Sequence, residues 1–262
     1  GKNRSICSSY VAFYRNILIV ISLGLLAAGI YYYFVHRGHY NALGGLRNVL
    51  NEVLDDDGYS VDHIENEARL RDLWELDQIC YGDENISLEV LRAWWKTYEK
   101  GIYLLKEKNK VIGAFGLFPM SKDGFREILE GKAREEDITP DFIETNVSAL
   151  GHQEWYLSGI ALRVAFRRTH AVRYLIASAL EMWLEAHALN AHIKIVALAY
   201  TREGEALLKR FGFGKYKERK ETLSRYPVYL YETKKIGKFQ EVINRLIDTK
   251  AKKAKIKAKN IS

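Results

Sequence analysis

The spacing of hydrophobic residues changes several times along the chain, and each change predicts a new element. Residues 68–80 and 168–189 repeat apolar side chains every three to four positions, which predicts two amphipathic helices. Ser87 is a residue type that accepts a hydrogen bond from the first turn of a helix. It therefore predicts a further helix, whose apolar face includes Trp94 and Trp95.

Short apolar runs between these helices predict strands. Polar residues at 107–110 separate two such runs, which indicates a β-hairpin. The expected strands are 102–106, 111–118, 155–162, 193–200 and 228–233, with a polar helical insert before the third and a short helix, 203–210, before the last. The strand 193–200 has no charge after Lys194, so we expect it to be central. This order predicts an α/β fold, a mixed sheet flanked by helices on both faces.

The N-terminal part contains a longer hydrophobic segment of another kind. Residues 17–35 include no charged side chain, and as a helix they span roughly 28 Å. That length crosses the hydrocarbon core of a bilayer, and Tyr31, Tyr32 and Tyr33 lie where an aromatic belt is expected. We predict one transmembrane helix; a signal peptide and a buried core helix are the alternatives.

Composition divides the chain into four parts. They are an N-terminal segment with the predicted span (1–37), a juxtamembrane connector (38–56), a folded body (57–233) and a basic tail (234–262). The formal net charge of the whole chain is +7, and the tail alone accounts for it. The body is therefore near neutral, and its charge does not indicate an acidic partner. Two cysteines exclude a disulfide-dense scaffold and a Cys-based zinc site, and we expect no metal.

The tail combines a helical apolar stripe with a run of lysines. A basic amphipathic helix of this kind is typical of contact with an anionic membrane surface. Nucleic acid is the less favoured partner, because the predicted span already brings a membrane close. A packed C-terminal helix with a solvated end is the remaining alternative.

Residues 155–233 contain a strand, a loop and two helices in an informative order. The first strand ends at Leu162 and continues through Phe166 and Arg167 into a long helix. A buried strand follows, and a short helix then closes on Gly212 and Phe213. With the hairpin before it, this order resembles the GNAT superfamily of N-acetyltransferases, which carries the pattern R/Q-x-x-G-x-G/A at the loop. The resemblance implies a GNAT-like fold for the body.

The resemblance also implies acetyl-CoA as co-substrate and an amine as acceptor, whose identity the sequence does not give. In the family the strand before the loop pairs with the pantetheine arm, and the loop amides and helix N-terminus hold the pyrophosphate. The implied cofactor-binding positions here are Ile160, Leu162, Arg167, Arg168, Thr169, His170, Ala171, Val172 and Arg173.

The loop departs from the family's pattern at both glycine positions. His170 and Val172 stand where Gly and Gly/Ala are expected, and a side chain there changes the turn. Arg167, Arg168 and Arg173 surround the helix start, where cations oppose the helix dipole unless an anion binds. We predict that these arginines replace the missing amide contacts to phosphate. Loss of cofactor binding is the alternative.

Polar residues alternate along the strand that precedes the loop. His152, Glu154 and Tyr156 share one face of it, near the thioester that the resemblance implies. We predict Glu154 as the general base, with His152 as the second candidate. Leu208 stands where the family often has a tyrosine acid, so Tyr156 or Tyr200 is expected to protonate the thiolate. An exposed strand start for the first two residues and a packing role for Tyr200 are the alternatives.

Together these patterns predict a membrane-anchored, acyl-CoA-dependent N-acyltransferase that moves an acetyl group to an amine. The alternatives are a transferase of the same fold with another acyl donor and a catalytically silent, membrane-tethered module. The Lys and Arg count around the span favours an inside N-terminus only weakly, whereas the basic tail and acetyl-CoA suit the cytoplasmic side. We therefore expect a single-pass membrane protein whose body faces the cytoplasm.

Overall fold

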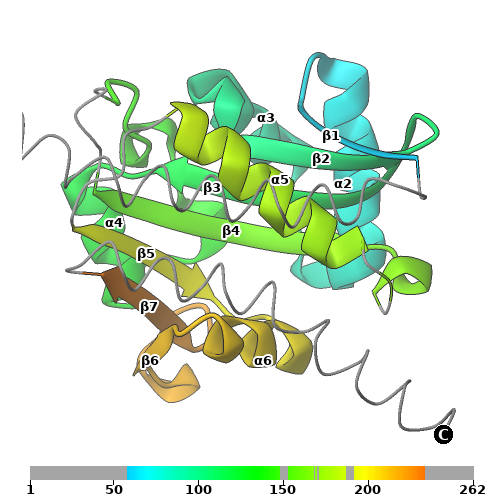
Figure 1. Ribbon diagram of the computed structural model, residues 1–262. Helices are drawn as coiled ribbons and strands as arrows, with labels where there is room; N and C mark the ends of the chain where they lie inside the picture. The colour runs from blue at the N-terminus through cyan, green and yellow to red at the C-terminus, as the bar shows by residue number, and fades with distance from the viewer. Residues whose placement is uncertain (1–57, 148–152, 168, 170, 187–191, 234–262) are drawn as a thin grey trace, which may run out of the picture.

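The computed structural model describes residues 58–147, 153–167, 169, 171–186 and 192–233. These residues form a seven-stranded sheet in the order β1-β2-β3-β4-β5-β7-β6 (Figure 1). The strands are β1 (Tyr59–His63), β2 (Ile102–Glu107), β3 (Lys110–Pro119), β4 (Glu154–Leu162), β5 (Ile193–Leu198), β6 (Gly214–Lys217) and β7 (Val228–Thr233). Neighbouring strands are antiparallel except β4 and β5, which are parallel. The predicted mixed α/β sheet is confirmed.

Helices cover both faces of this sheet. They are α2 (Glu67–Tyr81), α3 (Leu88–Thr97), α4 (Lys122–Leu129), α5 (Ala171–Ala186) and α6 (Arg202–Arg210). The apolar stripe of α5 and Leu208 of α6 form one core with the sheet, and Figure 1 shows α5 lying across the strands on that side. Helices α2, α3 and α4 form a second core on the opposite face. The predicted arrangement of helices on both faces is confirmed.

Local side-chain chemistry sets several of the element ends. The Ser87 hydroxyl accepts a hydrogen bond from the Val90 amide at 3.3 Å, which confirms the predicted start of α3. Between β2 and β3, Lys108 and Asn109 have φ angles of 47° and 68°. Two consecutive positive φ angles are those of a tight hairpin turn, and they confirm the predicted hairpin.

Two strands and several boundaries differ from the sequence prediction. The edge strands β1 and β6 were not predicted, because each is short and is stabilised by pairing with β2 or β7 rather than by its own pattern. Strand β5 ends at Leu198 because the Thr201 hydroxyl caps α6, accepting from the Gly204 amide at 3.0 Å. The polar insert contains α4 and then short 3-10 turns, including Glu135–Asp137.

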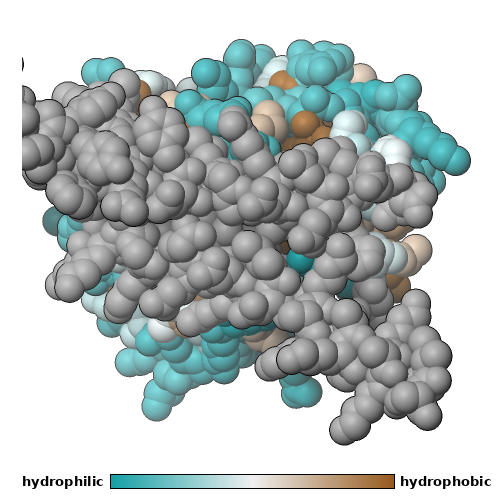
Figure 2. Space-filling model, viewed as in Figure 1, coloured by the Kyte–Doolittle hydropathy of each residue, from teal (hydrophilic) through white to brown (hydrophobic). Residues whose placement is uncertain are grey.

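Few large apolar side chains are exposed on the described surface. The described residues that are visible in Figure 2 are mainly hydrophilic. The exposed large apolar side chains of the described part are Ile79, Val164, Tyr216 and Leu223, which come from four separate segments. Single exposed apolar residues of this kind are normal on a folded body.

The predicted membrane contacts fall on other parts of the chain. No helix in the described ranges is long and apolar enough to cross a bilayer. The predicted span (17–35), the connector (38–56) and the basic tail (234–262) lie outside the described residues. These three assignments therefore stay predictions.

Candidate functional site

Strands β4 and β5 run side by side for only part of their length. Their parallel register ends where Leu157 faces Ala197, yet β4 continues to Leu162. At the same point the register of β4 with β3 shifts, so that Ser158 is an extra residue without a partner. Such a bulge bends its strand. Beyond Leu157, β4 therefore diverges from β5 and leaves a backbone edge without a strand partner on that side.

The diverging strands enclose a cleft of about 370 Å³, called the splay cleft below. Its walls come from β4, the end of β5, α6 and the start of α5. The lining includes Tyr81, Ser158, Gly159, Ile160, Leu162, Arg167, Val172, Tyr200 and Leu208. Four of the predicted cofactor positions, Ile160, Leu162, Arg167 and Val172, thus meet in one cavity.

The segment between β4 and α5 is held by its own side chains. The Arg167 Nε donates to the Leu162 carbonyl at 2.9 Å, so this arginine is fixed beside the strand end. The Thr169 hydroxyl accepts from the Ala171 amide at 3.1 Å and caps the start of α5. Of the remaining predicted cofactor positions, Thr169, Ala171 and Arg173 do not line the cleft, and Arg168 and His170 lie outside the described residues.

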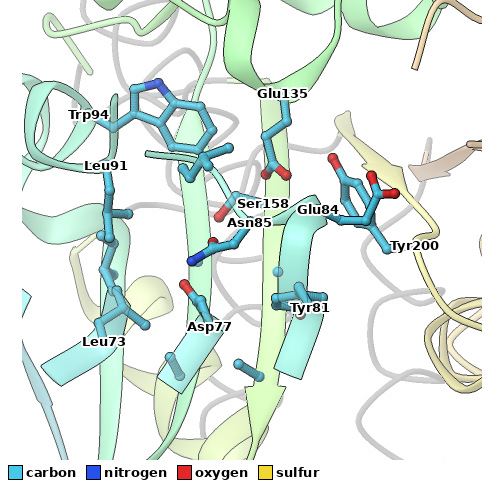
Figure 3. Close-up of a pocket in the computed structure, with 16 residues that line it drawn as sticks. Leu73, Asp77, Tyr81, Glu84, Asn85, Leu91, Trp94, Glu135, Ser158 and Tyr200 are labelled. Atoms are coloured by element: carbon cyan, nitrogen blue, oxygen red, sulfur yellow. The ribbon is translucent and has the colours of Figure 1, made fainter. Parts of the chain in front are cut away.

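A second, smaller cavity of about 50 Å³ adjoins the splay cleft and is called the acidic pocket below. The two cavities share Tyr81, Ser158, Gly159, Ala161 and Tyr200, so they lie side by side. The acidic pocket is lined by the carboxylates Asp77, Glu84 and Glu135 and by apolar residues that include Leu73, Leu91 and Trp94. Figure 3 shows Asp77 and Glu135 pointing into it from opposite sides.

Glu135 lines the acidic pocket and contacts Tyr200, which lines both cavities. The Tyr156 hydroxyl donates to its carboxylate at 2.8 Å, and Tyr200 forms a second side-chain hydrogen bond to it. Burial of the carboxylate raises the pKa of Glu135 to about 7, although both tyrosines act in the opposite direction. A carboxylate with this pKa exchanges protons readily near neutral pH, as a general base must.

The turn that carries Glu135 is anchored at both ends of its short 3-10 segment. The Arg134 amide donates to the Asp137 carboxylate at 3.0 Å. Just after the turn, the buried indole Nε1 of Trp94 donates to the Ile138 carbonyl at 2.7 Å. Helix α3 thus fixes the position of a catalytic candidate that lies about 40 residues further along the chain.

Helix α2 contributes two groups from consecutive turns. Burial raises the pKa of Asp77 well above its usual range, and the nearby charge of Glu135 raises it further by a smaller amount. The Tyr81 hydroxyl, one turn later, accepts a hydrogen bond from the Ile160 amide on the edge of β4. Burial also raises the pKa of Tyr81, so this phenol is neutral at physiological pH.

The predicted catalytic residues divide between two places. Tyr156 and Tyr200 both contact Glu135, and Tyr200 lines both cavities. Glu154, the predicted base, does not line either cavity. Its carboxylate lies 3.5 Å from the Lys194 ammonium at the beginning of β4, about 13 Å along the strand from Ser158. His152 lies outside the described residues.

Sequence reasoning missed Asp77 and Glu135. Asp77 lies beside the apolar stripe of α2, next to the buried Leu76, and a carboxylate there was a usable signal. Glu135 is one acid in the highly charged run 134–137, which reads as a solvated surface. Its contacts with Tyr156 and Tyr200 identify it, and the first of these joins residues that are 21 positions apart.

Comparison with solved structures shows which known fold the body resembles. The sequence matches no protein-family model and no curated protein. The structure is similar to the loading GNATL domain of CurA from Lyngbya majuscula, with a TM-score of 0.50 and 14% identity over 68% of this chain and 98% of that one. The body has a GNAT-like fold.

Two further solved structures are similar at lower scores. One is an N-acetyltransferase from Staphylococcus aureus Mu50 (TM-score 0.41, 21% identity, 66% of this chain and 100% of that one). The other is a GphF GNAT-like decarboxylase in complex with isobutyryl-CoA (TM-score 0.44, 15% identity, 66% of this chain and 98% of that one). The described residues contain no group of three or more His, Cys, Asp or Glu side chains arranged for a metal ion.

Proposed function

We propose that the protein is an acyl-CoA-dependent N-acyltransferase that moves an acetyl group from acetyl-CoA to an amine. The observation that carries this proposal is Glu135, a carboxylate with a pKa of about 7 that lines the acidic pocket and contacts Tyr200, a residue of both cavities. The splay cleft, of about 370 Å³, is the larger space and suits a donor, and the other cavity is small and acidic, as suits an amine. A silent module has no need for a buried carboxylate at such a junction.

The donor is proposed to lie in the splay cleft. Among the described residues, the edge of β4 beyond Leu157 has no strand partner on the β5 side, so its amides and carbonyls offer hydrogen bonds to the amide groups of pantetheine. Arg167 lies at the far end of that edge, where it can contact phosphate oxygens. The position of Val172 on the cleft wall supports contacts through arginine rather than through a glycine-rich loop.

The transfer then uses three groups of this chain. Glu135 takes a proton from the amine, whose nitrogen attacks the thioester carbonyl carbon. The new N–C bond forms, the C–S bond breaks, and the electron pair leaves on the CoA sulfur. Tyr200 is proposed to give that thiolate its proton, since it lines both cavities and burial raises its pKa so that it stays protonated. Leu208, also on the cleft wall, has no proton to give.

Loss of the Arg167 guanidinium tests this donor site. In calorimetric titration of the full chain in detergent, CoA should bind to the wild type, and Arg167→Ala should weaken that binding about tenfold or more, because a charge-assisted contact to phosphate is lost. Pantetheine, which has no phosphate, should be affected much less. Arg163→Ala is the matched control, because the Arg163 Nε also donates to a backbone carbonyl, at 3.1 Å, but its side chain lies outside the cleft.

Two results would contradict parts of this proposal. If millimolar CoA and acetyl-CoA do not bind to the wild-type protein, the silent module replaces the acyltransferase. If CoA binds and Arg167→Ala has the affinity of the wild type, the phosphates lie elsewhere in the cleft.

Residues 17–35 are proposed to anchor this activity in a membrane, with the body on the cytoplasmic side and the basic tail against anionic lipid. The support is the uncharged apolar run itself. Carbonate extraction of membranes should leave the full chain in the pellet and should release a chain that begins near residue 40. Equal release of both chains would show that the run is not an anchor.

A further inference from the structure

The acidic pocket contains negative groups without a positive one. Three carboxylates line it, from Asp77, Glu84 and Glu135, and none of the described residues in its lining is Lys, Arg or His. Asp77 and Glu135 repel each other, because the charge of Glu135 is one of the groups that act on Asp77. A cationic ligand would relieve this repulsion, whereas an anionic one would increase it.

Asp77 is the carboxylate of this pocket that lacks a partner. Glu135 receives hydrogen bonds from Tyr156 and Tyr200, and Glu84 receives one from Tyr226. Within the described part of the chain, Asp77 has no hydrogen-bond donor and no ion-pair partner. Figure 3 shows its carboxylate pointing into the cavity. An ammonium group could supply both the charge and the hydrogen-bond donors that a carboxylate in this position lacks.

The walls between the two carboxylates select the shape of that ligand. Apolar side chains from α2 and α3, Leu73, Leu91 and Trp94, line the pocket and suit methylene groups. Tyr81 and Tyr200, whose ring centroids lie 6.0 Å apart, provide aromatic surfaces that attract cations. The pocket is small, about 50 Å³, so a ligand in it also uses the adjoining space of the splay cleft, which Tyr81 and Tyr200 line as well.

We infer that the acceptor is an aliphatic diamine or polyamine, whose reacting amine lies beside Glu135 while its second ammonium pairs with Asp77. This inference rests on the proposed acyltransferase function. In the reaction the amine beside Glu135 loses its proton to that carboxylate and becomes an amide, and the thioester sulfur leaves as in any acyl transfer. The second ammonium keeps its protons and takes no part in bond making.

Three four-carbon amines that differ in the charge of the group at the far end test which charge the pocket prefers. The full chain in detergent, supplied with acetyl-CoA, is assayed for thiol release with 1,4-diaminobutane, butylamine and 4-aminobutanoate. We expect kcat/KM for the diamine to exceed that for butylamine about 10- to 100-fold, the usual value of a charge-assisted hydrogen bond. The anionic 4-aminobutanoate should be the poorest acceptor.

The Asp77→Asn variant tests the assigned carboxylate. Its ratio of kcat/KM for the diamine over butylamine should fall to within a few-fold of one. Glu84→Gln is the comparison variant, and it should keep most of the preference because Glu84 is already bonded to Tyr226. A binding measurement supports the assay if Asp77→Asn folds poorly: 1,4-diaminobutane should raise the Tm of the wild-type protein, and butylamine at the same concentration should not.

The outcomes distinguish this inference from the function on which it rests. If butylamine or 4-aminobutanoate is acetylated as well as the diamine, the diamine assignment is wrong and the acyltransferase stands. An unchanged preference in Asp77→Asn also overturns the assignment. If acetyl-CoA binds but no amine is acetylated, the proposed function fails and the inference fails with it.

Discussion

Replacement of Glu135 by glutamine is expected to lower kcat by about 10²- to 10⁴-fold, the usual contribution of a general base. The wild-type kcat should rise with pH and level off above pH 7, because the pKa of Glu135 is about 7 and only the carboxylate accepts a proton. The variant should lack that rise. Its affinity for CoA should be close to that of the wild type, because Glu135 does not line the splay cleft. Steady-state kinetics over pH 5–9 measures both effects.

The same substitution should stabilise the folded body at alkaline pH. In the folded protein the pKa of Glu135 is about 7, above its usual value of 4.5. Between these two pH values the folded protein keeps a proton that the unfolded chain has lost, so stability falls as pH rises through this window and stays lower above it. Glutamine does not titrate. At pH 8 the variant should therefore be more stable by about 1 to 3 kcal/mol, a few degrees in Tm, and the difference should disappear near pH 4.5.

Glu136→Gln is the matched control for both measurements. Glu136 is the next residue of the same turn, but its carboxylate is exposed and pairs with Arg134 on the surface. Its replacement should change neither kcat nor the pH profile appreciably. A Glu135→Gln protein that keeps more than a tenth of the wild-type kcat would remove Glu135 from the role of base.

The second large effect is expected at Trp94. This indole is 1% exposed, contacts Phe118 and Tyr156 edge to face, and donates to the Ile138 carbonyl. Trp94→Ala should lower the free energy of unfolding by about 3 to 5 kcal/mol, the range for a buried aromatic residue. Chemical denaturation measures this loss.

Phenylalanine variants separate the contribution of the indole N–H to stability from that of the aromatic ring. Trp94→Phe keeps a ring but leaves the Ile138 carbonyl without its donor, which should cost about 1 to 3 kcal/mol and lower kcat by releasing the turn that carries Glu135. Trp95→Phe is the control on the same helix, because the Trp95 Nε1 is buried and has no hydrogen-bond partner among the described residues. It should be neutral or slightly stabilising. Equal losses in Trp94→Phe and Trp95→Phe would show that the hydrogen bond to Ile138 does not hold the turn.

The sequence predicts those parts of the fold that local patterns determine. Ser87 marks a helix start, and the polar run 107–110 marks a hairpin, because capping and tight turns depend on a few adjacent residues. The edge strands β1 and β6 have no such signal. Each forms because a longer neighbour offers hydrogen bonds, and that neighbour is distant in sequence.

The candidate site was less accessible to sequence reasoning. Glu154 was predicted as the base because it shares a strand face with Tyr156, but a common face does not fix position along the strand. The parallel pairing with β5 places Glu154 opposite Lys194, whereas the β4 residues that line the two cavities begin at Leu157. Glu135 reaches Tyr156 from an insert with no periodic pattern. Such a contact is a property of the tertiary structure alone.

Residues at the end of helix α2 line both cavities. The Tyr81 hydroxyl accepts a hydrogen bond from the Ile160 amide, on the side of the splay cleft. Asp77 lies one helical turn earlier, in the acidic pocket. A donor atom that takes over this amide must displace the Tyr81 hydroxyl, and the same side chain lines the acidic pocket. The binding energies of the two substrates are then linked, and linkage is symmetrical: whatever factor the donor imposes on the affinity for the amine, the amine imposes on the affinity for the donor.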